Sequence, residues 1–390
     1  MATQEAAECT SSAAQSDGSV ESASVGNTYV GTSGYVYAHW RQGAFYPTGT
    51  KQAKELEYYS GRLSAVEVNA TYHGLQTVET LRKWQTNARR GFKFVLKAHQ
   101  DITHRSRLHN VDSLWQVFVD RAVDGLGDAL GPCLVQLPPS FARTPQTMAD
   151  LQTFLALPRR GLRLAFEFRH RSWYTEEVYA MMSTHNACIV DNVSPDGTTL
   201  RCERITADFG YTRMHKRLKP DGGPDTTNYT AELLTPLLPT LMAQRQNGKD
   251  HYVFFMNDLN AHGPHNGVEL QRLLAAQLKA EGREAEPALV TNWHPLSRET
   301  QKGALKRMFK QAHGRPSTAG TAGAAGTAGA PLSSASVCDA TAATTAHRSV
   351  SAMLPVSSKQ ASERGSSHGG SPRSKAPKRG QPSIQSFFKK

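Results

Sequence analysis

Two glutamates and a lysine stand within or at the ends of apolar runs of this sequence, at Glu67, Lys97 and Glu167. Two carboxylates near one opening can divide into an acid and a base when their surroundings push their pKa values apart. A partly buried lysine that is crowded by cations can act instead as a nucleophile and form a Schiff base. A structural alternative stays open, because Lys97, Arg169 or Arg213 could hold either glutamate ionised in a buried network.

Other polar side chains follow the same apolar runs and complete a candidate site. The candidate catalytic residues are Glu67, Lys97, His104, Glu167, Arg169, His170, Asp191, His215 and Asn257. The candidate ligand-binding residues are Ser33, Tyr35, Asn69, Gln136, Arg213, Lys216 and Asp258. Arg169, Arg213 and Lys216 would repel one another at one rim unless acids or a phosphate neutralise them. We therefore expect a phosphorylated or nucleic-acid ligand.

The same set contains side chains of the types that hold divalent metals. They are His104, His170 and His215, with Glu167, Asp191 and Asp258. No His-x-Glu or His-x-x-x-His pair on one element fixes a coordination geometry. A divalent metal is therefore left open, and the sequence assigns no cofactor.

Eight apolar runs alternate with amphipathic stretches over about 270 residues. The apolar runs are 28–32, 66–71, 92–98, 133–137, 164–168, 187–190, 211–214 and 252–256. The amphipathic stretches include 53–59, 77–87, 113–126, 145–157, 175–184, 231–246 and 267–280. This pattern predicts an α/β fold, a single (β/α)₈ TIM-type barrel, although an open doubly wound sheet would alternate in a similar way. In such a barrel the carboxyl ends of the strands form one rim, where the candidate residues should converge.

Composition separates the barrel from two tails. Residues 1–27 are predicted to be a disordered acidic tail, 28–313 the barrel, 314–380 a disordered Ala/Gly/Ser-rich basic linker and 381–390 a docking peptide. The chain has a net charge of +12, to which residues 315–390 contribute +8 and residues 1–28 contribute −4, leaving +8 for residues 29–314. Both basic parts suit a polyanionic partner, and DNA is the expected one.

The expected location is the nucleus. The start of the chain lacks the features of a secretory signal, and no stretch of about 18 apolar residues is present, so we expect an intracellular protein without a membrane partner. Five scattered cysteines form no disulfide framework and indicate a reducing compartment. The basic segment 375–379 fits a nuclear import signal, although a solvated basic linker has the same composition.

The last ten residues resemble the PIP box, the peptide that docks proteins onto the sliding clamp of replication, proliferating cell nuclear antigen. The resemblance rests on Gln381, Ile384, Phe387 and Phe388. In that mode one helical turn gathers the three apolar side chains into a plug, and the glutamine adds hydrogen bonds beside it. The resemblance implies that this clamp is a partner.

Several motifs of the central region resemble the YecE-like family, which is the family of domain of unknown function seventy-two. They are Gly31-Thr-Ser-Gly-Tyr-Val-Tyr-Ala-His-Trp40, Val66-Glu-Val-Asn69, Gln136-Leu-Pro-Pro-Ser-Phe141, Glu167-Phe-Arg-His170 and Phe255-Met-Asn-Asp258. The resemblance implies a TIM-type barrel and leaves the reaction open. Two departures are visible, since Lys216 stands where the family usually has glycine and Met256 where it usually has asparagine.

Three functions remain open from the sequence. The first is a clamp-associated enzyme of DNA replication or repair, a hydrolase or lyase acting on nucleic acid at the barrel rim. The second is a non-catalytic adaptor for nucleic acid or the clamp. The third is a metabolic enzyme acting on a phosphorylated or sugar substrate. Carboxylates at several strand ends favour an enzyme, because a protein that only binds would not require them.

Overall fold

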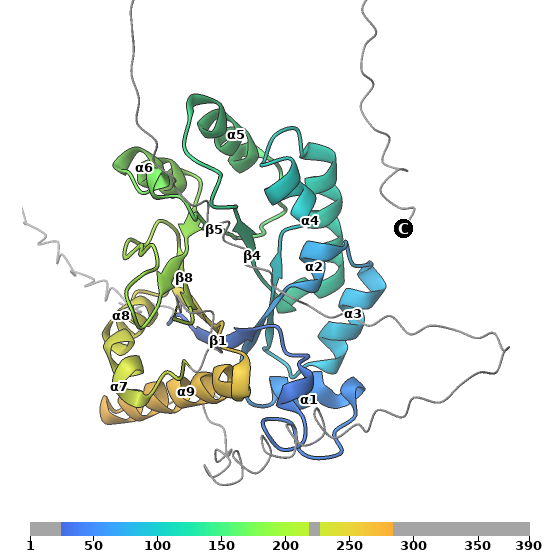
Figure 1. Ribbon diagram of the computed structural model, residues 1–390, viewed down its shortest axis with the longest axis vertical. Helices are drawn as coiled ribbons and strands as arrows, with labels where there is room; N and C mark the ends of the chain where they lie inside the picture. The colour runs from blue at the N-terminus through green and yellow to red at the C-terminus, as the bar shows by residue number, and fades with distance from the viewer. Residues whose placement is uncertain (1–24, 218–226, 284–390) are drawn as a thin grey trace, which may run out of the picture. The chain divides into compact units, whose positions relative to one another are not determined.

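All strands of the structure, a computed structural model that describes residues 25–217 and 227–283, pair in parallel within one sheet (Figure 1). They are β1 (Thr28–Ser33), β2 (Ala65–Val68), β3 (Lys93–Lys97), β4 (Leu130–Gln136), β5 (Leu164–Glu167), β6 (Ala187–Ile189), β7 (Asp191–Val193), β8 (Phe209–Met214) and β9 (Asp250–Phe255). Their order in the sheet is β6-β5-β4-β3-β2-β1-β9-β8-β7.

The two edges of this sheet meet at Val190. That residue alone separates β6 from β7, and the two strands pair with β5 and β8 respectively. They therefore act as one interrupted strand that nearly closes the sheet into a barrel with eight strand positions. Each of the eight apolar runs forms a strand at its expected place, so the predicted TIM-type barrel is confirmed.

Helices surround the barrel on its outer side (Figure 1). They are α1 (Glu55–Ser60), α2 (Ala70–His73), α3 (Val78–Asn87), α4 (Asp112–Leu126), α5 (Pro145–Ala156), α6 (Glu176–Thr184), α7 (Ala231–Leu234), α8 (Leu238–Gln246) and α9 (His262–Ala280). Threonines start three of them, because the hydroxyls of Thr77, Thr144 and Thr175 each accept a hydrogen bond from the first turn of α3, α5 and α6.

Two predicted helices differ from the observed ones. The predicted helix 231–246 is divided, because Pro236 and Pro239 cannot continue an α-helical hydrogen-bond ladder and a short 3₁₀ turn, Thr235–Leu237, joins α7 to α8. The last helix begins at His262 rather than at 267, since Pro264 falls in its first turn, where a proline is tolerated.

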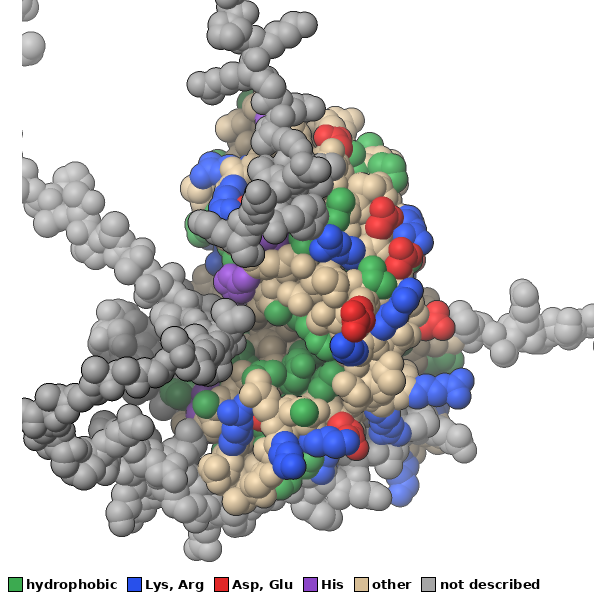
Figure 2. Space-filling model, turned by 90° about the vertical axis from the view of Figure 1, so that its right-hand side faces the viewer, with side chains coloured by type: hydrophobic (Ala, Val, Ile, Leu, Met, Phe, Trp, Pro, Cys, Tyr) green, Lys and Arg blue, Asp and Glu red, His purple; other side chains and the backbone are tan. Residues whose placement is uncertain are grey.

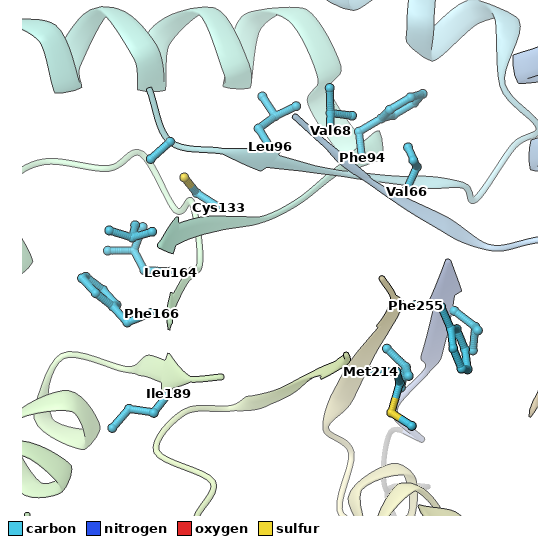
Figure 3. Packing of buried hydrophobic residues seen from close by; sticks show 14 of the residues in the cluster. Val66, Val68, Phe94, Leu96, Cys133, Leu164, Phe166, Ile189, Met214 and Phe255 are labelled. Atoms are coloured by element: carbon cyan, nitrogen blue, oxygen red, sulfur yellow. The ribbon is translucent and has the colours of Figure 1, made fainter. Parts of the chain in front are cut away.

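Apolar side chains form two layers because successive residues of a strand face opposite sides. One layer fills the space between strands and helices and includes Val66, Val68, Phe94, Leu96 and Phe166 (Figure 3). The other fills the barrel interior and contains Ala65, Val95, Leu134, Ala165, Cys188, Val190, Ala207, Phe209, Tyr211, Tyr252 and Phe254. The inner layer fixes which later residues of each strand point into the barrel.

An ion pair closes the end of the barrel where the strands begin. Arg163 pairs with Asp250 at 3.0 Å and donates to the hydroxyl of Tyr252 at 2.6 Å. We assign these contacts to stability, since the sites of TIM-type barrels lie at the opposite end. Within the described residues no helix is long and apolar enough to cross a membrane. The predicted tails 1–27, 314–380 and 381–390 lie outside the described residues, apart from the last three residues of the first.

Candidate active site

One face of each strand carries the candidate side chains to the end of the barrel where the strands finish. Counting two residues onward from the inner layer, Ala65 leads to Glu67, Val95 to Lys97, Leu134 to Gln136 and Ala165 to Glu167. On β8 the same count leads from Tyr211 to Arg213, and on β1 the pairing of Ser33 with Glu67 brings the serine beside them. These residues share one mouth.

Arg213 crosses the barrel and joins the two glutamates. Its Nη2 atom donates to Oε1 of Glu67 at 2.7 Å, and its Nη1 atom donates to Oε2 of Glu167. All three side chains are buried. Burial would lower the pKa of Arg213, but the two carboxylates outweigh it and hold this pKa above its ordinary value.

Further donors satisfy the carboxylate of Glu67. Ser33 donates to its Oε1 atom at 2.8 Å, and Tyr211 donates to its Oε2 atom at 2.9 Å. Asn69 in turn donates to the Ser33 hydroxyl at 3.0 Å. Both oxygens of Glu67 therefore have partners, as a buried carboxylate requires.

Glu167 is satisfied in the same way from β4 and β5. Gln136 donates to its Oε1 atom at 3.1 Å and Arg169 donates to the same atom at 2.7 Å. Burial alone would raise the pKa of Glu167, but Arg213 and Arg169 hold it well below the usual range. Glu167 is thus ionised at neutral pH and does not hold a proton to donate. This is the satisfied network that the sequence left open as an alternative to acid and base catalysis.

Lys97 lies at the same mouth without a carboxylate partner. Its ammonium nitrogen lies 4.2 Å from the ring centroid of Tyr72. Among the described residues, no hydrogen bond or ion pair reaches this nitrogen. Burial, followed by repulsion from Arg213, lowers the pKa of Lys97 to about 8.

Two histidines beside these cations are neutral. His104 packs edge-on against the Tyr72 ring with 5.1 Å between ring centroids, and burial and the charge of Lys97 lower its pKa to about 4. The Nε2 atom of His215 is 2.8 Å from Oδ1 of Asn192, and burial and Arg213 lower its pKa to about 4. Near pH 7 such imidazoles can accept protons.

Counting formal charges gives the mouth an excess of one positive charge. Lys97, Arg169 and Arg213 carry three positive charges against the two carboxylates of Glu67 and Glu167. Arg169 is the cation open to solvent, with 41% of its side chain exposed. An anion is the ligand that this arrangement would neutralise.

Comparison with known proteins assigns the family. Residues 29–289 match the family described as "Protein of unknown function DUF72". The chain belongs to this family. The UPF0759 protein YunF of Bacillus subtilis (strain 168) is 24% identical to it over 255 residues, which cover 59% of this chain and 90% of that protein.

Two solved DUF72 structures resemble the barrel. The DUF72 family protein TM1631 of Thermotoga maritima MSB8 is 26% identical, with a TM-score of 0.55 over 64% of this chain and 99% of that one. The DUF72 family protein EF0366 of Enterococcus faecalis V583 is 18% identical, with a TM-score of 0.52 over 64% of this chain and 98% of that one. Both structures agree with the TIM-type barrel, and neither protein is named for a reaction.

Two predicted residues of this DUF72 barrel take part in local structure rather than in the network. His170 starts a 3₁₀ turn, Arg171–Trp173, where its Nδ1 atom accepts from the backbone of Ser172 at 3.2 Å. Asp191 accepts two hydrogen bonds from Arg201, at 2.7 and 3.0 Å. The structure does not bring either side chain into the Arg213 network.

Asn257 and Asp258 support the loop after β9. Asn257 donates to the backbone of Thr227 at 3.0 Å and to Oδ1 of Asn266 at 2.8 Å. The carbonyl of Asp258 accepts from the indole of Trp40 at 2.7 Å. Their described contacts hold the start of α9 and the first loop in place.

Tyr35 and Lys216 also lie apart from the network. The backbone carbonyl of Tyr35 accepts from the Tyr46 hydroxyl at 2.6 Å, and burial and the charge of Glu55 raise the pKa of Tyr35 to about 12. Lys216 is exposed just beyond β8.

The predicted metal ligands do not assemble. In residues 25–217 and 227–283 no group of three or more His, Cys, Asp or Glu side chains could hold a metal ion. His104 and His215 border the network, whereas His170, Asp191 and Asp258 have the separate partners given above.

Two aromatic residues of the mouth were not among the predicted site residues. Tyr211 shares the inward face of β8 with Arg213, so alternation along the strand was the signal that could have found it. Tyr72 lies on α2, and its contact with Lys97 depends on the turn that this helix makes.

Proposed function

We propose that this chain is a sliding-clamp-associated protein of DNA replication or repair that acts in the nucleus and processes nucleic acid at the barrel mouth. The observation that carries the proposal is the positive excess left by the network of Glu67, Glu167, Arg169 and Arg213 together with Lys97. A phosphodiester supplies the negative charge that the mouth lacks.

The arrangement of donors supports a phosphate ligand in particular. Arg169 uses its Nε atom on Glu167, and its exposed guanidinium has further donors that fit a phosphate. Lys97 adds a second point charge at the same mouth. The clamp association rests on Gln381, Ile384, Phe387 and Phe388, which lie outside the described residues.

Changing Arg169 to glutamine should reduce the salt dependence of DNA binding. Each phosphate contact that is lost should lower the slope of log K against log salt by about 0.7–0.9. Fluorescence anisotropy of the full chain on a labelled oligonucleotide, between low and moderate salt, measures this slope.

Arg160→Gln is the matched control for that variant. Arg160 has 42% of its side chain exposed, pairs with Asp120 and Asp124, and lies in the loop that leads into β5, at the end of the barrel opposite the mouth. The Arg160→Gln variant removes the same charge as Arg169→Gln and leaves the C-terminal tail unchanged. Equal slopes of log K against log salt for the two variants would show that Arg169 at the mouth makes no phosphate contact. A flat salt response of the wild type would favour a metabolic enzyme instead.

Replacing Phe387 and Phe388 by alanine should abolish clamp binding. Aromatic anchors of this kind usually contribute at least ~2 kcal/mol each, because they supply most of the buried apolar contact. Calorimetry of peptide 371–390 against the clamp measures the loss, and the same double change in the full chain checks it. Unchanged affinity would contradict the PIP-box interpretation.

A further inference from the structure

Lys97 carries an amine at the mouth that takes no part in the hydrogen bonds and ion pairs of the described network. Both oxygens of Glu67 and both oxygens of Glu167 accept hydrogen bonds, so neither carboxylate is left to activate water. The amine of Lys97 instead faces the ring of Tyr72 and makes no hydrogen bond or ion pair with the residues described.

A second lysine on the same strand shows what a structural lysine looks like in this barrel. Lys93 and Lys97 are the first and last residues of β3 and lie on the same face of the strand. Lys93 donates to the backbone carbonyl of Asp128 at 2.6 Å. Lys97 has no such partner, although it is half-buried.

The surroundings of Lys97 favour the neutral amine. With the pKa of this group lowered to about 8, roughly a tenth of it is unprotonated at pH 7, whereas an ordinary lysine with a pKa near 10.4 is unprotonated in less than about one molecule in a thousand. An amine of this kind attacks carbonyl carbon, as lysines that form Schiff bases do.

We propose that Lys97 condenses with the aldehyde of a phosphate-flanked sugar, the ring-opened abasic residue of DNA, and so makes the mouth a lyase. This inference rests on the proposed function, because the flanking phosphates are the groups that Arg169 would hold. The position of the Lys97 amine supports it, because the amine lies beside two glutamates whose oxygens all have partners and beside the exposed Arg169.

The reaction needs no oxidant or reductant. The Lys97 amine adds to C1′ of the aldehyde, and loss of one water leaves an imine. A base removes a proton from C2′, and the electron pair expels the 3′ phosphate as the C3′–O bond breaks. Water then hydrolyses the imine, which frees Lys97 and leaves an unsaturated aldehyde on the upstream strand.

His104 is placed to take the C2′ proton. It contacts the same Tyr72 ring as Lys97, and it is neutral near pH 7. It lies on a short π-helical turn, Asp101–Arg105, that follows β3 after three residues. The strand that carries the amine therefore leads directly into the turn that carries the base.

Borohydride trapping tests the proposal. The full chain is mixed with a labelled duplex that contains one abasic site, and sodium borohydride reduces any imine to a stable bond between protein and DNA. We expect a trapped adduct with the wild type and with Lys93→Arg, and none above background with Lys97→Arg, which keeps the charge. His104→Gln should still be trapped but should cleave the strand about 10²-fold more slowly.

Mass spectrometry of the wild-type adduct makes the test independent of the variants. The peptide that carries the modification must contain Lys97, and any other site overturns the proposal. No adduct from a wild-type chain that binds the DNA with the salt dependence above also overturns it, while the proposed function stands. An adduct with deoxyribose 5-phosphate in a chain that does not bind DNA overturns the DNA substrate and the proposed function together.

Discussion

Arg213 reaches from β8 to glutamates on β2 and β5, so one side chain joins three parts of the barrel wall. Its burial means that the two carboxylates around it cannot be solvated by water. Arg169 and Lys97, by contrast, face the opening and are available to a ligand. At the scale of residues, the mouth is a buried network of ion pairs beside which Arg169 and Lys97 are partly exposed.

Replacing Arg213 with methionine should strongly destabilise the fold. It would leave two buried carboxylates without a counter-charge, which costs about 3–5 kcal/mol in the free energy of unfolding. At about 2–4 °C per kcal/mol for a domain of this size, Tm should fall by about 6–20 °C. Thermal melting followed by circular dichroism measures the change.

Two comparison variants sharpen this prediction. Arg160→Met breaks an exposed pair and should cost less than about 1 kcal/mol. The triple variant Glu67→Gln, Glu167→Gln and Arg213→Met removes the three buried charges, leaves the partly exposed Arg169 in place and should recover most of the lost stability. A cost for Arg213→Met as small as that for Arg160→Met would show that the network is not buried as described.

At the scale of elements, alternation along the strands decides which candidates enter the site. Glu67, Lys97, Gln136 and Glu167 could be predicted because each is the last or next-to-last residue of a strand and follows an inward-facing residue by two positions. The same count excludes His170, since it follows Arg169 by one position and faces the other way. The alternation of side chains at β5 could therefore be read from the sequence, and it was enough to remove His170 from the candidates.

The strand β6 shows why the orientation of other candidate side chains could not be predicted from the sequence. The run 187–190 is continuously apolar, as strands buried on both faces are, so its inward face cannot be read from the pattern. In the structure Cys188 and Val190 face inward, which turns Asp191 away from the barrel to meet Arg201. The partners of Asn257, namely Thr227 and Asn266, come from loops and helices that no local pattern brings together.

A methyl group at Gly31 should disrupt the pairing of β1 with β2. A Cβ atom there would lie 2.0 Å from the backbone oxygen of Ala65, on the neighbouring strand. Overpacking of this kind costs about 1–3 kcal/mol or more, so Gly31→Ala should lower Tm by at least about 2–4 °C. Gly61→Ala is the control, since its Cβ would have no neighbour closer than 3.5 Å. Equal melting temperatures for the two variants would contradict the close approach of the strands.

At the scale of the whole molecule, the outer surface carries charges of both signs. Figure 2 shows the side of the barrel that carries α2, α3 and α4, where Lys and Arg side chains are interspersed with Asp and Glu. Ion pairs such as Lys83 with Glu79 and Arg160 with Asp124 balance charges there. The excess at the mouth has no such balance among the described residues.

The fold and the side-chain contacts of the mouth differ in how far the sequence predicts them. Membership of DUF72 accounts for the barrel, and sequence alone was enough to predict it, because eight apolar runs and their spacing are long-range features of the chain. The geometry of the mouth depends on side-chain contacts such as that of Lys97 with Tyr72, which the spacing of residues does not fix.

The measurement that tests the central claim most directly is turnover of labelled DNA by the full chain. Single-stranded, nicked and abasic oligonucleotides are incubated with chelator, magnesium, manganese or zinc, using the wild type, Arg169→Gln and Arg160→Gln. We predict shorter labelled strands with the wild type and with Arg160→Gln. Arg169→Gln should be slower by about tenfold or more, the effect of losing a charge-assisted hydrogen bond worth about 1.5–3 kcal/mol. No shorter strand under any condition, or equal rates for all three proteins, would contradict a DNA-processing site at the barrel mouth.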